Sequence, residues 1–80
     1  NIYTSMLKAL EQIDSNREGV RQAERGFVIA QTHYSAGVGT LLELNDAEIA
    51  LTQARLNLNQ SMYDYLAAET EYRQLLGQQL

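Results

Sequence analysis

The fold of this 80-residue chain is decided by one short segment, Ser35-Ala36-Gly37-Val38-Gly39-Thr40. Gly37 suits the left-handed backbone conformation that commonly ends a helix. Thr40 and Glu43 have the T-x-x-E spacing of a capping box, which begins a helix. No proline is present to interrupt a helix on either side of the segment. The sequence therefore predicts a single α-helical hairpin over 1–80, with one helix over about 2–36, a tip loop over 37–40 and a second helix over about 41–77.

A regular 3-4 spacing of seam residues predicts how the two helices pack. In the first helix the seam runs through Met6, Ala9, Ile13, Asn16, Val20, Ala23, Phe27, Ala30 and Tyr34. In the second helix it runs through Leu44, Ala47, Leu51, Ala54, Leu58, Ser61, Tyr65, Ala68, Tyr72 and Leu75. Folding at the tip pairs large residues with large ones and small with small, which allows close knobs-into-holes packing. We expect an all-α fold, a long antiparallel coiled-coil hairpin, with Asn16 and Ser61 in one polar layer.

A second apolar row lies nearly opposite the seam of the second helix. It has seven-residue spacing and consists of Leu42, Ile49, Leu56 and Tyr63. An isolated hairpin has no use for apolar side chains on its far side, so this row predicts a further partner. Neighbouring helices on both flanks, as in a cylinder of helices, would cover it. A hairpin that dimerises into a four-helix bundle would bury the same row, and the row alone does not choose between these arrangements.

The composition excludes several classes of protein. A net charge of −4 and a pI near 4.7 argue against nucleic-acid binding, which needs a basic surface. No window approaches the roughly 18 consecutive apolar residues of a membrane-spanning helix. The first ten residues lack the apolar core of a signal peptide and already follow a helical pattern, so we expect a fragment of a larger protein. With no cysteine, disulfides and thiolate metal sites are excluded.

The residues of the tip, and those that follow it, resemble a known family. They read Tyr34-Ser35-Ala36-Gly37-Val38-Gly39-Thr40 and then Leu41-Leu42-Glu43-Leu44-Asn45-Asp46-Ala47-Glu48. This order is similar to the second long hairpin of the TolC-like outer-membrane efflux proteins (outer membrane factors). The similarity continues through Leu51, Ala54-Arg55, Tyr63-Asp64-Tyr65-Leu66 and Leu75-Leu76-Gly77. The chain departs from the family pattern at Asn45, where leucine is usual, at Glu48, near a usual glutamine, and at Gly39, where some members carry a basic residue.

The resemblance implies a part of a homotrimeric channel that exports drugs, other small molecules or proteins. The long hairpins of that family form a periplasmic α-barrel on an outer-membrane protein. Their tips form the tunnel entrance and meet the hairpins of a periplasmic adaptor (membrane fusion protein), which links the channel to an inner-membrane pump. Transport through the channel is passive, so no enzyme activity is expected. The flanking helices of such a barrel would cover the second apolar row.

Five tip residues are candidates for the adaptor contact that this resemblance implies: Gly37, Val38, Gly39, Thr40 and Leu41. Two glycines without side chains would let a partner helix lie against the loop backbone. The plain alternative is that the loop only reverses the direction of the chain.

Glu43 and Asp46 lie one helical turn apart just after the tip. In a trimer, three copies of each would form acidic rings that narrow the entrance, favour cations and respond to pH or divalent ions. Alternatively, Glu43 only completes the capping box and Asp46 only interacts favourably with the helix dipole. Tyr34 is either the last packed layer of the seam or a residue that hydrogen-bonds a neighbouring hairpin when the entrance is closed.

Neither catalysis nor a cofactor is indicated. His33 is the only histidine and has no carboxylate within one helical turn, so we expect no metal site. No plausible catalytic triad or phosphate-binding loop occurs, and the tyrosines fit packing between helices.

Overall fold

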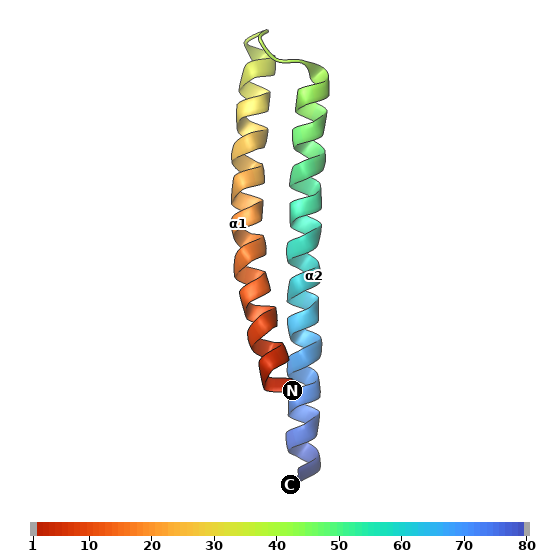
Figure 1. Ribbon diagram of the computed structural model, residues 1–80. Helices are drawn as coiled ribbons and strands as arrows, with labels where there is room; N and C mark the ends of the chain where they lie inside the picture. Colours follow the sequence, from red (N-terminus) through yellow and green to blue (C-terminus); the bar gives the residue numbers. More distant parts are fainter. Residues whose placement is uncertain (1, 80) are drawn as a thin grey trace.

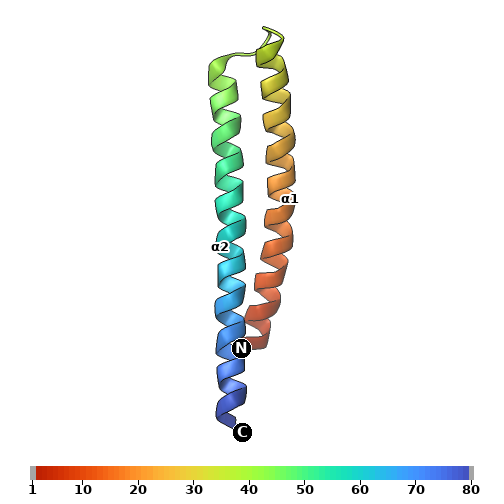
Figure 2. The same cartoon turned by 180° about the vertical axis from the view of Figure 1, so that it is seen from behind.

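A computed structural model describes the backbone of residues 2–79 and the side-chain burial of residues 3–77, and it shows an antiparallel helical hairpin. Helix α1 spans Ile2–Ser35 and helix α2 spans Leu41–Gln79. The two helices lie side by side, and α2 continues beyond the start of α1 (Figure 1, Figure 2). The hairpin measures 65 × 14 × 13 Å. The described part of the chain therefore confirms the all-α fold and the helical hairpin expected from the sequence.

The helix ends fall close to the predicted positions. The first helix ends at Ser35 rather than Ala36, because the N–H of Gly37 already bonds to Tyr34 as part of the turn. The second helix begins at Leu41, as predicted, and continues past Gly77 to Gln79. Gly77 has no turn-forming neighbours, so the helical hydrogen bonds pass through it.

The predicted seam is the interface between α1 and α2. Ile13, Leu51 and Ser61 are buried, and the other seam residues are half-buried, except for the two end positions Tyr34 and Leu75. The core of the hairpin is thus one narrow line of layers. Because isolated helices draw most of their stability from such packing, this line is what holds the two helices together.

The polar layer of the seam contains Asn16 and Ser61 together, and each side chain makes its own hydrogen bond. Asn16 Nδ2 donates to the backbone oxygen of Asn57 across the interface, at 3.1 Å. Ser61 Oγ donates to the backbone oxygen of Leu58 within its own helix, at 2.8 Å. Each side chain satisfies its hydrogen bond on a carbonyl group, which is always available along a helix, so the two need not meet each other.

Charge is distributed unequally between the helices. In α1 four basic residues balance four acidic ones, whereas α2 carries two basic and six acidic residues, so the net charge of −4 lies on α2. Arg55 of α2 approaches Glu24 of α1 at 4.0 Å, and Arg21 pairs with Glu18 along α1 at 3.3 Å. All four side chains are exposed, and such pairs contribute little to stability.

Leu51→Ala is expected to lower the free energy of unfolding of the hairpin by roughly 2–3 kcal/mol, because it removes a buried seam side chain. Leu56→Ala is the matched control: it removes the same atoms from the exposed row of the same helix and should change stability by less than about 0.5 kcal/mol. Urea unfolding of the 80-residue chain, followed by circular dichroism, measures both. Equal losses would show that the seam is not the core.

Candidate functional site: the hairpin tip

The end of α1 is shaped by Gly37. Its φ angle is +80°, and it is the only glycine with positive φ among the described residues. The N–H of Gly37 donates to the carbonyl of Tyr34 at 3.1 Å, and the N–H of Val38 donates to the carbonyl of His33 at 3.0 Å. These two bonds make a Schellman motif, which satisfies carbonyl groups that the helix end would leave free. Gly37 therefore has the left-handed conformation predicted for it.

Gly39 is needed for a different reason. Its N–H also donates to the carbonyl of His33, at 3.0 Å, so the loop folds back onto the last turn of α1. A Cβ atom at this position would lie 2.9 Å from the Cβ of His33 and 3.2 Å from the backbone nitrogen of Tyr34. Any side chain at Gly39 must therefore push the loop away from α1. The sequence alone did not reveal this contact, because it depends on how the loop returns to the helix.

The start of α2 is fixed by Thr40 and Glu43. Thr40 Oγ1 accepts the N–H of Glu43 at 3.1 Å, and the N–H of Thr40 donates to Glu43 Oε2 at 3.5 Å. This reciprocal pair is the predicted capping box. With a helix-ending motif on one side and a helix-starting motif on the other, the loop has a defined shape.

At the tip, exposed apolar side chains lie next to glycine backbone that no side chain covers. Val38 is 76% exposed, and Leu41, Leu42 and Tyr34 are also exposed. Tyr34 is the most exposed seam residue of α1, so the last layer of the seam is only partly covered. Beside these side chains, Gly37 has open space where a Cβ would be. The tip thus presents exposed apolar side chains and exposed loop backbone next to each other.

The two acidic candidates are in different situations. Glu43 is held in the capping box. Asp46 is exposed on the following turn, and within residues 2–79 no side chain pairs with it. Asp46 is therefore the carboxylate of this pair that is available to ions or partners outside the hairpin, and it lies on the helix that carries the net negative charge.

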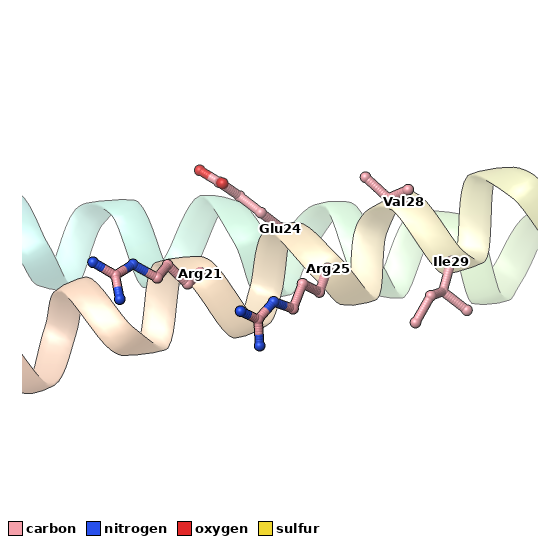
Figure 3. A pocket seen from close by; sticks show the side chains of 5 residues that line it. All are labelled: Arg21, Glu24, Arg25, Val28 and Ile29. Carbon is pink, nitrogen blue, oxygen red and sulfur yellow. The ribbon is translucent and has the colours of Figure 1, made fainter.

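A shallow groove lies on the outer side of α1, away from the tip loop. Figure 3 shows its five lining side chains extending outward from α1, with α2 behind: Arg21, Glu24, Arg25, Val28 and Ile29. Val28 and Ile29 are exposed apolar residues outside the seam. The sequence analysis did not single them out, although two adjacent β-branched residues off the seam were a usable signal. A second flank of the hairpin therefore also carries two exposed apolar side chains, beside three charged ones.

Among the described residues, no group of three or more His, Cys, Asp or Glu side chains could hold a metal ion. Neither helix contains, within residues 2–79, a stretch long and apolar enough to cross a bilayer.

A family model of outer membrane efflux proteins matches residues 1–78 of the sequence. The chain belongs to this outer membrane efflux protein family. The match spans both helices and the tip, and it confirms the family predicted from the tip residues. No curated protein and no solved structure matches the chain significantly. The hairpin is thus part of an outer-membrane protein of an efflux system, and the proteins of this family act as channels rather than as enzymes.

Proposed function

We propose that this efflux-protein hairpin forms part of the wall and entrance of a periplasmic tunnel. In this proposal the full-length protein is a homotrimer, and the hairpin tip docks the hairpin of a periplasmic adaptor. The adaptor joins the channel to an inner-membrane pump, and the tunnel exports drugs, other small molecules or proteins. The 80-residue chain supplies one element of the tunnel wall.

The observation that carries this proposal is the exposure of the second apolar row. Its four residues are 55% to 69% exposed in the lone hairpin: Leu42, Ile49, Leu56 and Tyr63. Burial of apolar surface contributes about 25 cal/mol per Å², so covering four large side chains favours association strongly. A helix packed against this side of α2 would cover the row along its three heptads.

The outer side of α1 supports neighbours on both flanks. Ile29 of α1 and Ile49 of α2 are expected at the same level of the hairpin, because the heptad register of the sequence pairs Phe27 with Leu51 and Ala30 with Ala47. At about 100° per residue, both isoleucines point away from the partner helix. Each is exposed. In a ring of hairpins about a common axis, the outer side of α1 in one hairpin would meet the outer side of α2 in the next, with Ile29 and Ile49 at the same level.

A dimeric four-helix bundle fits these observations less well. Two hairpins that pack through their α2 rows would bury Ile49 and Leu56 but leave Val28 and Ile29 of both copies in water. The family match over residues 1–78 also supports the tunnel. We therefore favour a closed cylinder of helices over a free-standing dimer.

The tip supports the docking part of the proposal. An exposed Val38 and two glycines in a loop of defined shape offer apolar contact and close backbone approach. Because the Schellman motif and the capping box hold the loop in place, a partner that binds here pays little ordering entropy.

The acidic residues support a cation-favouring entrance. Asp46 has no partner in the described hairpin, so three copies near a common axis would present unpaired carboxylates to the solution. Glu43 is already engaged in capping and would contribute less to such a ring. In this proposal Asp46 is the main charge of the entrance.

The channel is tested with the purified full-length protein in planar lipid bilayers. We expect cation-selective currents, and we expect Asp46→Ala to reduce both the cation selectivity and the block by divalent ions severalfold, because it removes three entrance charges. Glu43→Gln is the matched control: it keeps a capping side chain and should have the smaller effect.

The outcomes of this experiment separate two claims. An absence of current from the wild-type protein would argue against a channel. Normal current with unchanged selectivity in Asp46→Ala would leave the channel in place and remove the acidic ring.

A further inference from the structure

The hairpin has two broad faces, one on each side of the seam, and each carries a groove lined by both helices. One groove is polar, with Gln12 of α1 and Asn57 and Asp64 of α2 in its lining. The other is lined in part by Glu24 of α1 and Arg55 of α2, which approach each other across it. Asn57 and Arg55 are two residues apart, or about 200° around α2, so the grooves lie on opposite faces. We name these the amide face and the arginine face.

Heptad repetition extends both faces along the hairpin, because residues seven apart lie on the same side of a coiled-coil helix. The amide face comprises the positions that repeat every seven residues from Gln12 and Ser15 in α1 and from Asn57 and Gln60 in α2. The arginine face comprises the positions that repeat from Arg17 and Arg21 in α1 and from Thr52 and Arg55 in α2. Glu43 and Asp46, the two acidic candidates near the tip, therefore lie on the amide face.

The two faces differ in charge. Within residues 3–77 the amide face has four carboxylates, one lysine and one histidine: Glu43, Asp46, Asp64, Glu71, Lys8 and His33. The arginine face is neutral over the same range, with four arginines and four carboxylates. The three ion pairs found in that range each include an arginine of the arginine face, and none includes a carboxylate of the amide face. With the histidine neutral, three of the four excess negative charges of the chain thus lie on the amide face.

The two faces also differ in exposed apolar side chains. Among the described residues, the amide face has one large apolar side chain that is exposed, Ile29, and it lies at the edge next to the outer side of α1. The arginine face has an exposed apolar patch toward its base that includes Leu7, Leu10 and Leu66. Such patches are normally covered by another protein surface. The amide face, with its amides, carboxylates and small residues, is suited to permanent contact with water.

We propose that the amide face lines the tunnel and makes it selective for cationic cargo along its length, beyond the entrance. This inference rests on the proposed function, in which one broad face of the hairpin looks into the tunnel and the other looks outward. The face inside must stay open to water and cargo, which the amide face allows. An apolar patch that needs a cover suits the outward face, where a covering segment does not block transport.

The charge of the amide face sets the class of cargo. In a trimer each of its four carboxylates is present three times, so the tunnel has a negative potential that concentrates cations and repels anions. The near absence of exposed large apolar side chains on this face means that an organic cation meets few contacts that would retain it. Weak binding favours passage, because a cargo that enters must also leave.

Asp64→Asn in the full-length protein tests the charge of the tunnel away from its entrance. Asp64 lies 18 residues after Asp46, which is about 27 Å along α2, and asparagine can still accept the hydrogen bond from Gln60. We expect the ratio of cation to anion permeability to fall about twofold in planar bilayers at roughly 10 mM salt, where screening is weak. Asp14→Asn is the matched control. The heptad register places Asp14 at the level of Asp64 on the arginine face, so this variant should keep the wild-type ratio.

A second measurement identifies the face inside the tunnel directly. Ala50→Cys and Thr52→Cys place a thiol at exposed positions two residues apart, the first on the amide face and the second on the arginine face. A thiol reagent that carries a trimethylammonium group adds one positive charge at the modified position. It should lower the cation preference of Ala50→Cys channels and leave Thr52→Cys and wild-type channels unchanged.

The class of cargo is tested in an efflux-deficient strain. Asp64→Lys should lower resistance to a cationic drug severalfold and leave resistance to an anionic drug unchanged. Equal loss of resistance to both drugs, in a variant that still conducts, would remove the cationic cargo. Equal permeability ratios in Asp64→Asn and Asp14→Asn, or a reagent effect in Thr52→Cys instead of Ala50→Cys, would overturn the assignment of the faces. Failure of the proposed function looks different, because the wild-type protein itself would then show no channel current.

Discussion

Gly39→Val is expected to abolish drug efflux by the full-length protein while both helices of the hairpin remain formed. The Cβ of the new side chain would lie 2.9 Å from the Cβ of His33, and the last turn of α1 cannot give way without losing its own hydrogen bonds. The loop must therefore swing outward, at a cost of about 1–3 kcal/mol, and the surface that we propose for adaptor docking is lost. The loss of efflux is measured as the drug resistance of an efflux-deficient strain that carries the variant. Circular dichroism of the hairpin measures whether the helices remain formed.

Two companion variants separate the shape of the loop from its surface chemistry. Gly37→Asn should retain efflux, because asparagine tolerates the left-handed conformation and its Cβ meets no atom within 4 Å. Val38→Asp leaves the loop geometry alone and places a charge on the most exposed apolar side chain of the tip. It should weaken efflux and co-purification of the adaptor together. If Gly39→Val confers normal resistance, the tip is not the docking surface.

A lysine in the second apolar row is expected to prevent assembly of the full-length channel. Ile49→Lys replaces a side chain that is 66% exposed in the lone hairpin, so the 80-residue chain should keep its helicity and stability. In a closed cylinder the same position is covered, and a buried unpaired charge costs several kcal/mol. The trimer should therefore fail to form, which cross-linking and size-exclusion chromatography of the detergent-solubilised protein can detect.

Asn57→Lys controls for the added charge. Asn57 is an exposed polar residue of the same helix, about 100° around the helix from Leu56 and from Leu58, so it lies on neither the row nor the seam. This variant should assemble like the wild type. Should Ile49→Lys also assemble normally, the row faces solvent in the channel, and the cylinder of helices needs another interface.

Much of the hairpin could be predicted because its determinants are local or periodic. The capping box needs only Thr40 and Glu43, which are three residues apart, and the helix-ending role of Gly37 needs only its place after the last turn. The seam repeats every seven residues, so each layer supports the assignment of the next. These signals do not depend on a distant part of the chain.

The features that were missed depend on tertiary contacts. The fold-back of Gly39 onto His33 follows from the path of the loop, and nothing in the local sequence requires it. The sequence placed Asn16 in a polar layer but did not name its acceptor, the carbonyl of Asn57, because backbone acceptors are present at every level of the opposite helix. Tyr34 occupies a seam position but remains exposed, because it lies in the last layer before the loop. The proposed roles of Gly37, Val38, Thr40, Leu41, Glu43 and Asp46 in an assembled channel require partners that a single hairpin does not contain.

The thinness of the hairpin has a consequence for how this protein can evolve. With a cross-section of 14 × 13 Å, it buries only the single line of seam residues, and none of the described large side chains is fully buried. In a wall one helix thick, neighbouring positions on α2 would face the seam, the flanking helix, the cargo or the periplasm in turn. Mutational tolerance along α2 should therefore rise and fall about every 3.5 residues. Only the positions that face the cargo could change during adaptation to a new cargo, since the other positions of α2 are needed for packing within the wall.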